Sequence, residues 1–269
     1  MKKYTLLLPV CCLCLALGAC KKDVNQVVVA GSTSVQPYME ILAEEFMREN
    51  KGAEIFVQGG GSAAGIAAAE NKTADLGMSS RNLNEDEEYL WSVEIAKDGL
   101  ALIVNPQNPV RDITLENIRA IYSLEITDWQ QIGGKPAKIH IVTREEGSGT
   151  RSAFESLIMG ETEITGRAIV QDSNGAVRQI VSSDPDAIGF ISLGLVDKTV
   201  IALKLQGIEA TRANVINGSY QLYRPFLLVA DQAPAGEVKL FVDYILSAPG
   251  QGLLAAEGLI PREEATDEK

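Results

Sequence analysis

Histidine, cysteine and aromatic residues are scarce in this 269-residue chain. Its one histidine is His140, and its four cysteines, Cys11, Cys12, Cys14 and Cys20, all lie within the first 20 residues. A single histidine excludes a metal site built from several histidines and leaves little room for serine–histidine catalysis. Because no cysteine follows position 20, disulfide bonds cannot brace the body of the protein.

Positively charged residues are also fewer than negatively charged ones. The chain has 24 Lys and Arg against 36 Asp and Glu, which gives a formal net charge of −12, and aromatic residues make up 6% of it. This balance argues against a broad nucleic-acid-binding surface, which needs excess positive charge. Hydrophobic residues make up 46% and charged residues 22%, as in globular rather than disordered chains. The length suits one large or two ordinary domains.

The N-terminus has the pattern of an export signal. Two lysines precede a nearly uninterrupted apolar run over residues 4–17, which is shorter than a membrane-spanning helix of roughly 20 residues. The motif LGAC, which ends at Cys20, resembles a bacterial lipobox. This resemblance implies a signal peptide at residues 1–19, a diacylglycerol on the Cys20 sulfur and a lipid-anchored tether over residues 20–25. The alternative is an ordinary signal peptide that contains a cysteine.

After the tether, apolar strands alternate with amphipathic helices. Strands are expected at residues 26–30 and 54–58, each followed by a Gly/Ser turn and then a helix. Further strands are expected at 75–78, 100–105, 139–143, 187–192, 200–203 and 223–229, and further helices at 115–122, 151–159 and 238–247. This alternation predicts an open α/β sheet, whose ligands bind beyond the carboxyl ends of the strands.

Three hydroxyl-rich turns follow predicted strands and open predicted helices. They are GSTS at 31–34, GGGS at 59–62 and REEGSGTR at 144–151. Each turn presents backbone N–H groups and hydroxyls at the positive end of a helix dipole, which suits an oxyanion. The alternative is that Ser and Thr only cap their own helices. Arg144 favours the anion site, because a guanidinium group matches the geometry of phosphate.

Common enzyme motifs are missing from the sequence. No GxxxxGK[ST] string occurs, and a GxGxxG pattern that begins at Gly59 has Ala64 in its last position. Gly147-Ser148-Gly149 lacks the outer glycines of a GxSxG nucleophile elbow. His140 falls in an apolar strand pattern and is interpreted as structural. We therefore expect a protein that is not an enzyme, with no catalytic residue, no cofactor and no metal site.

Six segments, in their order along the chain, resemble the phosphate-binding lipoproteins of bacterial phosphate ABC importers, the PstS-like family. They are GSTSV at 31–35, GGGSAAG at 59–65, DLGMSSR at 75–81, LENIRAIYSLEITDWQQIGG at 115–134, REEGSGTR at 144–151 and AIGFISLG at 187–194. The likeness runs from about Val27 to Pro261, and the R-x-x-G-S-G-T string is specific. It implies a two-lobed, type II periplasmic-binding-protein fold whose hinge strands let the lobes close over a ligand.

The resemblance also implies an organisation and a function. Lobe 1 is expected over residues 26–103 and 225–269, and lobe 2 over residues 104–224. The protein is expected to capture inorganic phosphate outside the cell membrane and to deliver it to the permease subunits of an ABC importer. It is expected to be a monomer that binds no nucleic acid and meets the membrane only through its lipid, on the outer face of the cell membrane or the periplasmic side of a two-membrane envelope. The alternatives are the same fold with sulfate or molybdate, a surface phosphatase or phosphotransferase, and an adhesin or sensor that retains phosphate binding.

A set of phosphate ligands follows from the same resemblance. The expected ligands are Thr33, Ser34, Ser62 and Ser80 from lobe 1 and Arg144, Ser148, Gly149 and Thr150 from lobe 2. Glu146 is expected to orient the guanidinium group of Arg144. Many family members carry an aspartate at the position of Ser80, and that carboxylate accepts the proton of hydrogen phosphate, which sulfate lacks. Serine accepts without charge, so weaker discrimination against sulfate is expected here.

Overall fold

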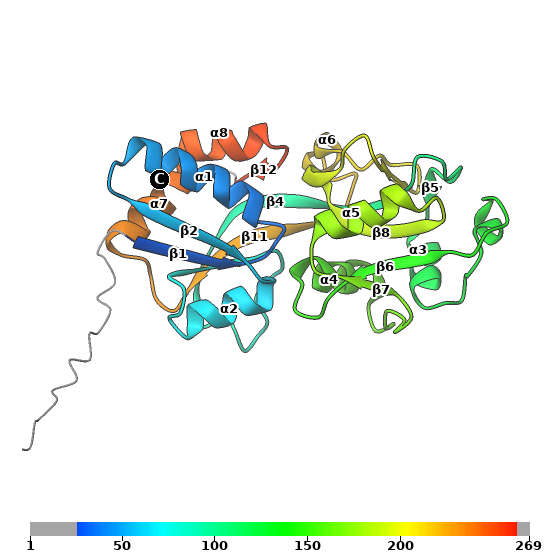
Figure 1. The fold of residues 1–269 in the computed structure, drawn as a ribbon, viewed down its shortest axis with the longest axis horizontal. Coiled ribbons are helices and arrows are strands. Elements are labelled where there is room, and N and C mark those ends of the chain that lie inside the picture. Colours follow the sequence, from blue (N-terminus) through cyan, green and yellow to red (C-terminus); the bar gives the residue numbers. More distant parts are fainter. Residues whose placement is uncertain (1–25, 263–269) are drawn as a thin grey trace, which may run out of the picture.

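Two α/β halves lie side by side along the long axis of the molecule (Figure 1). The computed structural model describes residues 26–262, so the predicted signal peptide, Cys20 and tether lie outside the described residues. The main strands are β1 (Gln26–Gly31), β2 (Glu54–Gly59), β3 (Leu76–Ser79), β4 (Trp91–Val104), β6 (His140–Arg144), β7 (Ile169–Gln171), β8 (Ala187–Ser192) and β11 (Tyr223–Ala230). They pair in the order β2-β1-β3-β11-β4-β8-β6-β7, which runs through both halves.

The half that contains β1 is covered by helices from both ends of the chain. These helices are α1 (Gln36–Glu49), α2 (Ser62–Glu70), α7 (Gly236–Leu246) and α8 (Ala248–Ala256). In α1, the apolar side chains of Met39, Leu42 and Phe46 recur at helical spacing and are buried. The rings of Phe46 and Phe241 lie 5.1 Å apart, so the N-terminal and C-terminal helices share one core.

The carboxyl ends of the first three strands meet at one edge of the sheet. The parallel register places Gly31 beside both Gly59 and Met78. Helix α2 lies close against this edge, because a Cβ atom on Gly65 would stand only 2.5 Å from the Cα of Gly31. Two facing glycines permit this approach, and it brings the turns after β1, β2 and β3 together.

The other half is built from the middle of the chain. Its helices are α3 (Leu115–Tyr122), α4 (Gly149–Phe154), the π-helix η2 (Glu155–Met159), α5 (Asn174–Ser183) and α6 (Arg212–Ile216). Strand β6 pairs in parallel with β7 and β8. Phe154 packs against Tyr122 and Phe190, with ring centroids 4.6 and 4.1 Å apart. This aromatic core fixes α4, which carries the third polar turn, against the sheet.

Strands β4 and β11 join the two halves. The first part of β4 pairs with β11 as far as Gly99, and the part from Leu100 onward pairs with β8. The sequence predicts only residues 100–105 as a strand, because Glu94 and Asp98 interrupt the apolar pattern of the first part. The lobe boundaries given above remain a prediction.

The structure contains several elements that the sequence does not predict. The sequence predicts neither β7 nor the helices α5, α6 and α8, and the helix expected at residues 151–159 begins at Gly149 and continues as a π-helix. The remaining short elements are β5 (Asp112–Ile113), η1 (Trp129–Ile132), η3 (Leu193–Leu195), β9 (Ile201–Ala202), β10 (Lys204–Leu205) and β12 (Ile260–Pro261). Among the helices within residues 26–262, none has the length and apolarity that a bilayer crossing requires.

Candidate functional site

Buried polar side chains gather where the three hydroxyl-rich turns meet. Nine of them are each no more than 2% exposed: Ser32, Ser34, Ser62, Ser80, Arg144, Ser148, Thr150, Asn174 and Arg224. We call these nine residues the inter-lobe cluster. Burying polar and charged groups costs free energy unless each finds a partner. The contacts within the cluster therefore decide what it can bind.

Hydrogen bonds in and beside the cluster connect the two halves of the molecule. The hydroxyl oxygens of Ser34 and Thr150 lie 2.7 Å apart, and Arg144 Nη2 donates to Thr33 Oγ1 at 3.0 Å. Thr33 and Ser34 follow β1, whereas Arg144 ends β6 and Thr150 stands in the first turn of α4. The turns of the two halves are thus in direct contact, and the guanidinium group and the hydroxyls that they bring together can all donate hydrogen bonds to an anion.

A second set of contacts surrounds Gly149. Ser62 Oγ accepts a hydrogen bond from the backbone N–H of Ser80 at 3.0 Å, and Ser32 Oγ donates to Ser80 Oγ at 2.8 Å. A Cβ atom on Gly149 would lie 2.2 Å from Ser62 Oγ and 2.6 Å from Ser80 Oγ. The start of α4 therefore presses directly against the two lobe-1 hydroxyls.

Ser148 caps helix α4. Its Oγ accepts from the N–H of Arg151 at 3.3 Å, and its carbonyl accepts from the N–H of Ser152 at 2.9 Å. The amides of Gly149 and Thr150 precede this first i→i−4 bond, so the helix does not use them. The structure thus brings all eight predicted ligands into or beside the inter-lobe cluster, while their role as ligands stays a prediction.

The carboxylate that orients Arg144 is that of Glu145. Its two oxygens accept from Nε and Nη2 of Arg144, both at 2.9 Å. The backbone N–H of Glu145 bonds to Gln171 O at 3.1 Å, which extends the pairing of β6 with β7 and holds this carboxylate along the guanidinium group. In this structure Glu145, and not Glu146, forms the ion pair with Arg144, and the orienting role expected of Glu146 stays a prediction.

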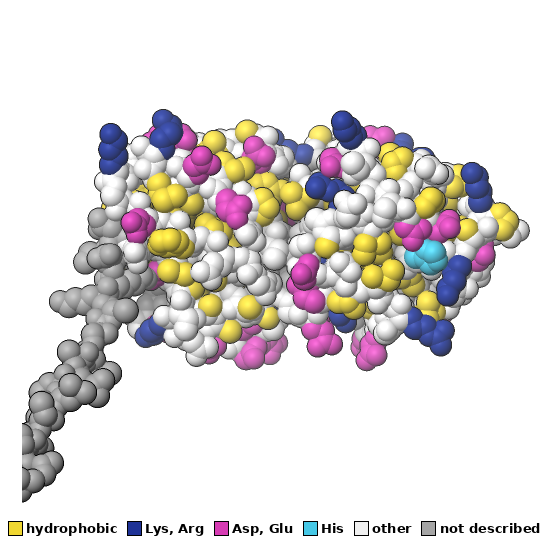
Figure 2. Space-filling model, in the orientation of Figure 1, with side chains coloured by type: hydrophobic (Ala, Val, Ile, Leu, Met, Phe, Trp, Pro, Cys, Tyr) yellow, Lys and Arg dark blue, Asp and Glu magenta, His cyan; other side chains and the backbone are white. Residues whose placement is uncertain are grey.

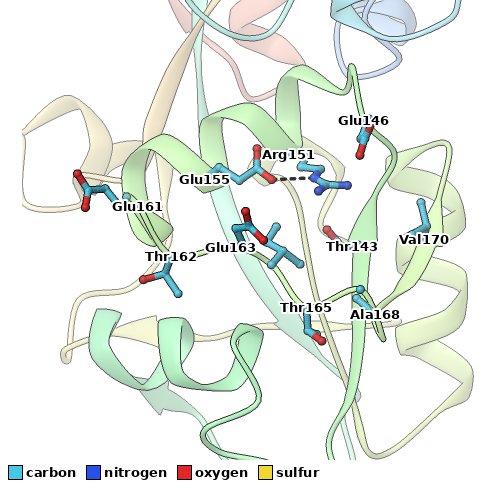
Figure 3. Close-up of a pocket in the computed structure, with 13 residues that line it drawn as sticks. Thr143, Glu146, Arg151, Glu155, Glu161, Thr162, Glu163, Thr165, Ala168 and Val170 are labelled. Atoms are coloured by element: carbon cyan, nitrogen blue, oxygen red, sulfur yellow. Dashed lines mark hydrogen bonds and ion pairs between the residues drawn. The ribbon is translucent and has the colours of Figure 1, made fainter.

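Glu146 instead lines a separate hollow in lobe 2 (Figure 3). This hollow has a volume of about 660 Å³ and also contains the ion pair of Arg151 with Glu155, whose Nε and Oε1 atoms lie 2.8 Å apart. Two more carboxylates, those of Glu161 and Glu163, line it. Four carboxylates against one arginine disfavour an anion, so the hollow is not a second candidate for an oxyanion site.

Two residues of the cluster are missing from the sequence-based set. Asn174, at the start of α5, donates from Nδ2 to Ser34 Oγ at 2.8 Å. Arg224, in β11, donates to Asp98 Oδ2 from Nε at 3.2 Å and from Nη2 at 3.0 Å, and Nη2 also reaches Ser34 Oγ at 3.2 Å. The sequence carries one signal for Arg224, which is a charged residue inside an otherwise apolar strand. It carries none for Asn174, because α5 itself is not predicted.

Burial shifts the acid–base balance of the Arg224–Asp98 pair. Both side chains are almost fully inaccessible to solvent. Burial raises the pKa of the Asp98 carboxyl and lowers the pKa of the Arg224 guanidinium group, while the attraction between the two opposes both shifts. The proximity of Arg144 lowers the pKa of Arg224 further. The positive charges of Arg144 and Arg224 therefore lie near each other in a part of the protein that is buried from solvent.

The charged groups elsewhere do not form such a site. His140 begins β6, at the end of the strand opposite Arg144, and its Nδ1 lies 2.7 Å from Asp184 Oδ2 at the surface. No three His, Cys, Asp or Glu side chains among residues 26–262 are placed to share a metal ion. Acidic side chains are dispersed over both halves on the face shown in Figure 2. Because the chain carries a formal net charge of −12, the attraction for an anion is expected to come from the buried donors rather than from the overall charge.

Comparison with known proteins places the chain in a family. Residues 20–249 match the model of the PBP superfamily domain. The chain belongs to the PBP superfamily. The phosphate-binding protein PstS of Bacillus subtilis is 32% identical over 247 residues, which cover 90% of this chain and 82% of that protein. The resemblance to the PstS-like family is thus confirmed.

Solved structures of similar proteins agree with the fold. A phosphate ABC transporter substrate-binding protein from Clostridium perfringens, with bound phosphate, is 42% identical; the match covers 89% of this chain and all (100%) of that one, with a TM-score of 0.86. An ABC-type phosphate transport receptor from Vibrio cholerae is 39% identical over 88% of this chain and 100% of its own, with a TM-score of 0.75. The predicted two-lobed, type II binding-protein fold is confirmed.

Proposed function

We propose that this protein binds inorganic phosphate in the inter-lobe cluster and delivers it to the permease subunits of an ABC importer. One observation carries the proposal: the buried donors of Arg144 and Thr150 meet the hydroxyls of Thr33 and Ser34 from the other lobe. A tetrahedral oxyanion can use such donors from both lobes at once, and its binding would favour the closed arrangement. The relatives named for phosphate binding support this choice of anion.

The proposed ligands are the eight residues predicted from the sequence, with Glu145 in place of Glu146 as the partner of Arg144. The lobes are proposed as residues 26–103 with 225–269 and residues 104–224. A non-catalytic, monomeric role is proposed, because capture and release of the ion need no general base. The carboxylates of Asp98 and Glu145, which lie against Arg224 and Arg144 of the cluster, are paired with those arginines. That pairing does not favour a phosphatase or phosphotransferase.

Calorimetric titration of the purified, phosphate-stripped protein tests the proposal. We expect saturable binding of phosphate and weaker binding of sulfate and molybdate. Tighter binding of sulfate or molybdate would instead support the alternative oxyanion importers. A protein that binds none of the three anions would contradict the proposed function.

Ser80 is expected to control the ratio of phosphate to sulfate affinity. Its hydroxyl oxygen accepts from Ser32 and lies 3.4 Å from Ser62 Oγ. This position among the turns supports the proposal that Ser80 also accepts a hydrogen bond from hydrogen phosphate. Ser80→Ala should reduce the difference between the binding free energies of phosphate and sulfate by about 1–2 kcal/mol, the cost of one buried hydrogen bond. Ser80→Asp should widen the ratio, because a carboxylate accepts the proton of hydrogen phosphate and repels sulfate.

Competition binding of both anions to the wild type and to the two Ser80 variants measures this ratio. Ser79→Ala is the matched control, because the neighbouring Ser79 hydroxyl donates to Arg81 O at 2.9 Å instead of joining the cluster. If Ser80→Ala leaves the ratio and both affinities unchanged, Ser80 does not contact the anion.

We also propose that the protein is exported and anchored by a lipid on Cys20, on the outer face of the cell membrane or the periplasmic side of a two-membrane envelope. The LGAC motif supports this proposal. Cys20→Ser should abolish incorporation of a radiolabelled fatty acid and leave an unprocessed or freely secreted protein. Cys14→Ser, in the preceding apolar run, is the control and should still be labelled. Label that persists in the Cys20 variant would contradict the lipobox interpretation.

A further inference from the structure

We propose that Arg224 is a second anion-binding arginine, which reaches the inter-lobe cluster from the connecting strand β11 and donates to the bound anion through Nη1. The proposal rests on the proposed function, since it assigns a further ligand to the same site. In this proposal, the positive charge of Arg224 attracts any doubly charged tetrahedral anion. This role differs from that of Ser80, whose hydroxyl is proposed to distinguish phosphate from sulfate.

The orientation of the guanidinium group is the first step of the argument. Its Nε–Nη2 side is occupied by Asp98 Oδ2. Its Nη2 also lies 3.2 Å from Ser34 Oγ, so the guanidinium group reaches the polar side chains that follow β1. Nη1 is buried and has no hydrogen-bond partner among residues 26–262. A buried guanidinium nitrogen without a partner is costly, and a bound oxyanion would supply one.

The second step is the convergence of two positive charges. Ser34 Oγ lies 2.7 Å from Thr150 Oγ1, and Arg144 Nη1 is 3.5 Å from the same Thr150 oxygen. Arg144 and Arg224 therefore approach one Ser34–Thr150 pair from different elements of the fold. Two buried cations this close repel each other, and an anion bound between them would turn that repulsion into attraction.

The third step concerns the neighbouring carboxylates. Asp98 Oδ1 accepts from Ser192 Oγ at 2.8 Å and Oδ2 from Arg224, while both oxygens of Glu145 accept from Arg144. Each carboxylate thus already accepts hydrogen bonds from protein groups, so neither is expected to accept one from hydrogen phosphate. Arg224 donates to either anion, and it is therefore expected to strengthen the binding of phosphate and sulfate alike and to leave the ratio of their affinities nearly unchanged.

Removing Arg224 alone would leave the buried Asp98 carboxylate without its cation, and the protein could then fail to fold. The test therefore uses Arg224→Gln combined with Asp98→Asn, which removes both charges and keeps side chains of similar size. Asp98→Asn alone is the matched variant that retains the arginine. Arg48→Gln removes an exposed arginine that pairs with Glu45 on α1, and it controls for the loss of one positive charge. Thermal melting confirms that each variant is folded.

Calorimetric titrations with phosphate and with sulfate then decide the matter. We expect the double variant to bind both anions roughly ten- to a hundred-fold more weakly than Asp98→Asn, with a similar loss for each. Arg48→Gln should bind as the wild type does. A folded double variant with the affinity of Asp98→Asn would overturn the proposal and leave Nη1 to water from the hollow of about 180 Å³ that Arg224 borders. A wild type that binds no phosphate would instead refute the proposed function.

Discussion

Arg144→Ala should weaken phosphate binding by about 2–4 kcal/mol, the range for a truncated, charge-assisted contact in a buried site. Arg144 is 1% exposed and contacts Thr33 from the other lobe and Thr150 from its own. Its loss removes a buried positive charge and the hydrogen bond from Arg144 to Thr33. Calorimetric titration with phosphate measures the effect.

Arg144→Lys should also lose affinity, although it keeps the charge. A lysine ammonium is a point charge and cannot bond to both oxygens of Glu145 while it also reaches Thr33. Glu145→Gln should weaken binding too, because it loosens the guanidinium group. Glu146→Gln is the matched control, since Glu146 lines the separate hollow of Figure 3 and should leave affinity unchanged.

Two results would contradict this assignment. Unchanged phosphate affinity in Arg144→Ala would remove the residue from the site. A larger effect from Glu146→Gln than from Glu145→Gln would show that the acidic partner changes when the anion binds, and would restore the role predicted from the sequence.

Local patterns in the sequence predict much of the fold. The spacing of Met39, Leu42 and Phe46 identifies α1, and the apolar runs identify β1, β6 and β8. The Gly/Ser turns are also local signals, because glycine and hydroxyl residues at a strand end mark where a helix begins. These signals predict that the turns after β1 and β2 lie together, because the carboxyl ends of parallel strands meet at one edge of the sheet.

The parts that the sequence does not predict depend on contacts between distant residues. The first half of β4 contains Asp98, a charge that argues against a buried strand until its pairing with Arg224 of β11 is known. The same pairing explains why an arginine occupies an apolar strand. The choice between Glu145 and Glu146 is decided by the bond from Glu145 N to Gln171 O, which depends on the unpredicted strand β7.

Gly149→Ala should weaken phosphate binding by about 2–3 kcal/mol, from the displacement of two buried hydroxyls at about 1–1.5 kcal/mol each. In this structure the added methyl group would lie 2.2 Å from Ser62 Oγ and 2.6 Å from Ser80 Oγ. The side chain of Ser62 also bonds to the N–H of Ser80, so it cannot rotate away without losing that bond. Titration with phosphate is the measurement.

The variant should separate closure from folding. Alanine is favoured over glycine within a helix by up to about 1 kcal/mol, and Gly149 stands in the first turn of α4. The proposed function requires the lobes to open for the anion, and in an open form the methyl group would be free of Ser62 and Ser80. The thermal stability of the ligand-free protein should therefore be unchanged or slightly higher, while phosphate affinity falls. Gly166→Ala is the control, because its Cβ would meet nothing within 4 Å. A loss of thermal stability that matches the loss of affinity would instead assign Gly149 a role in folding.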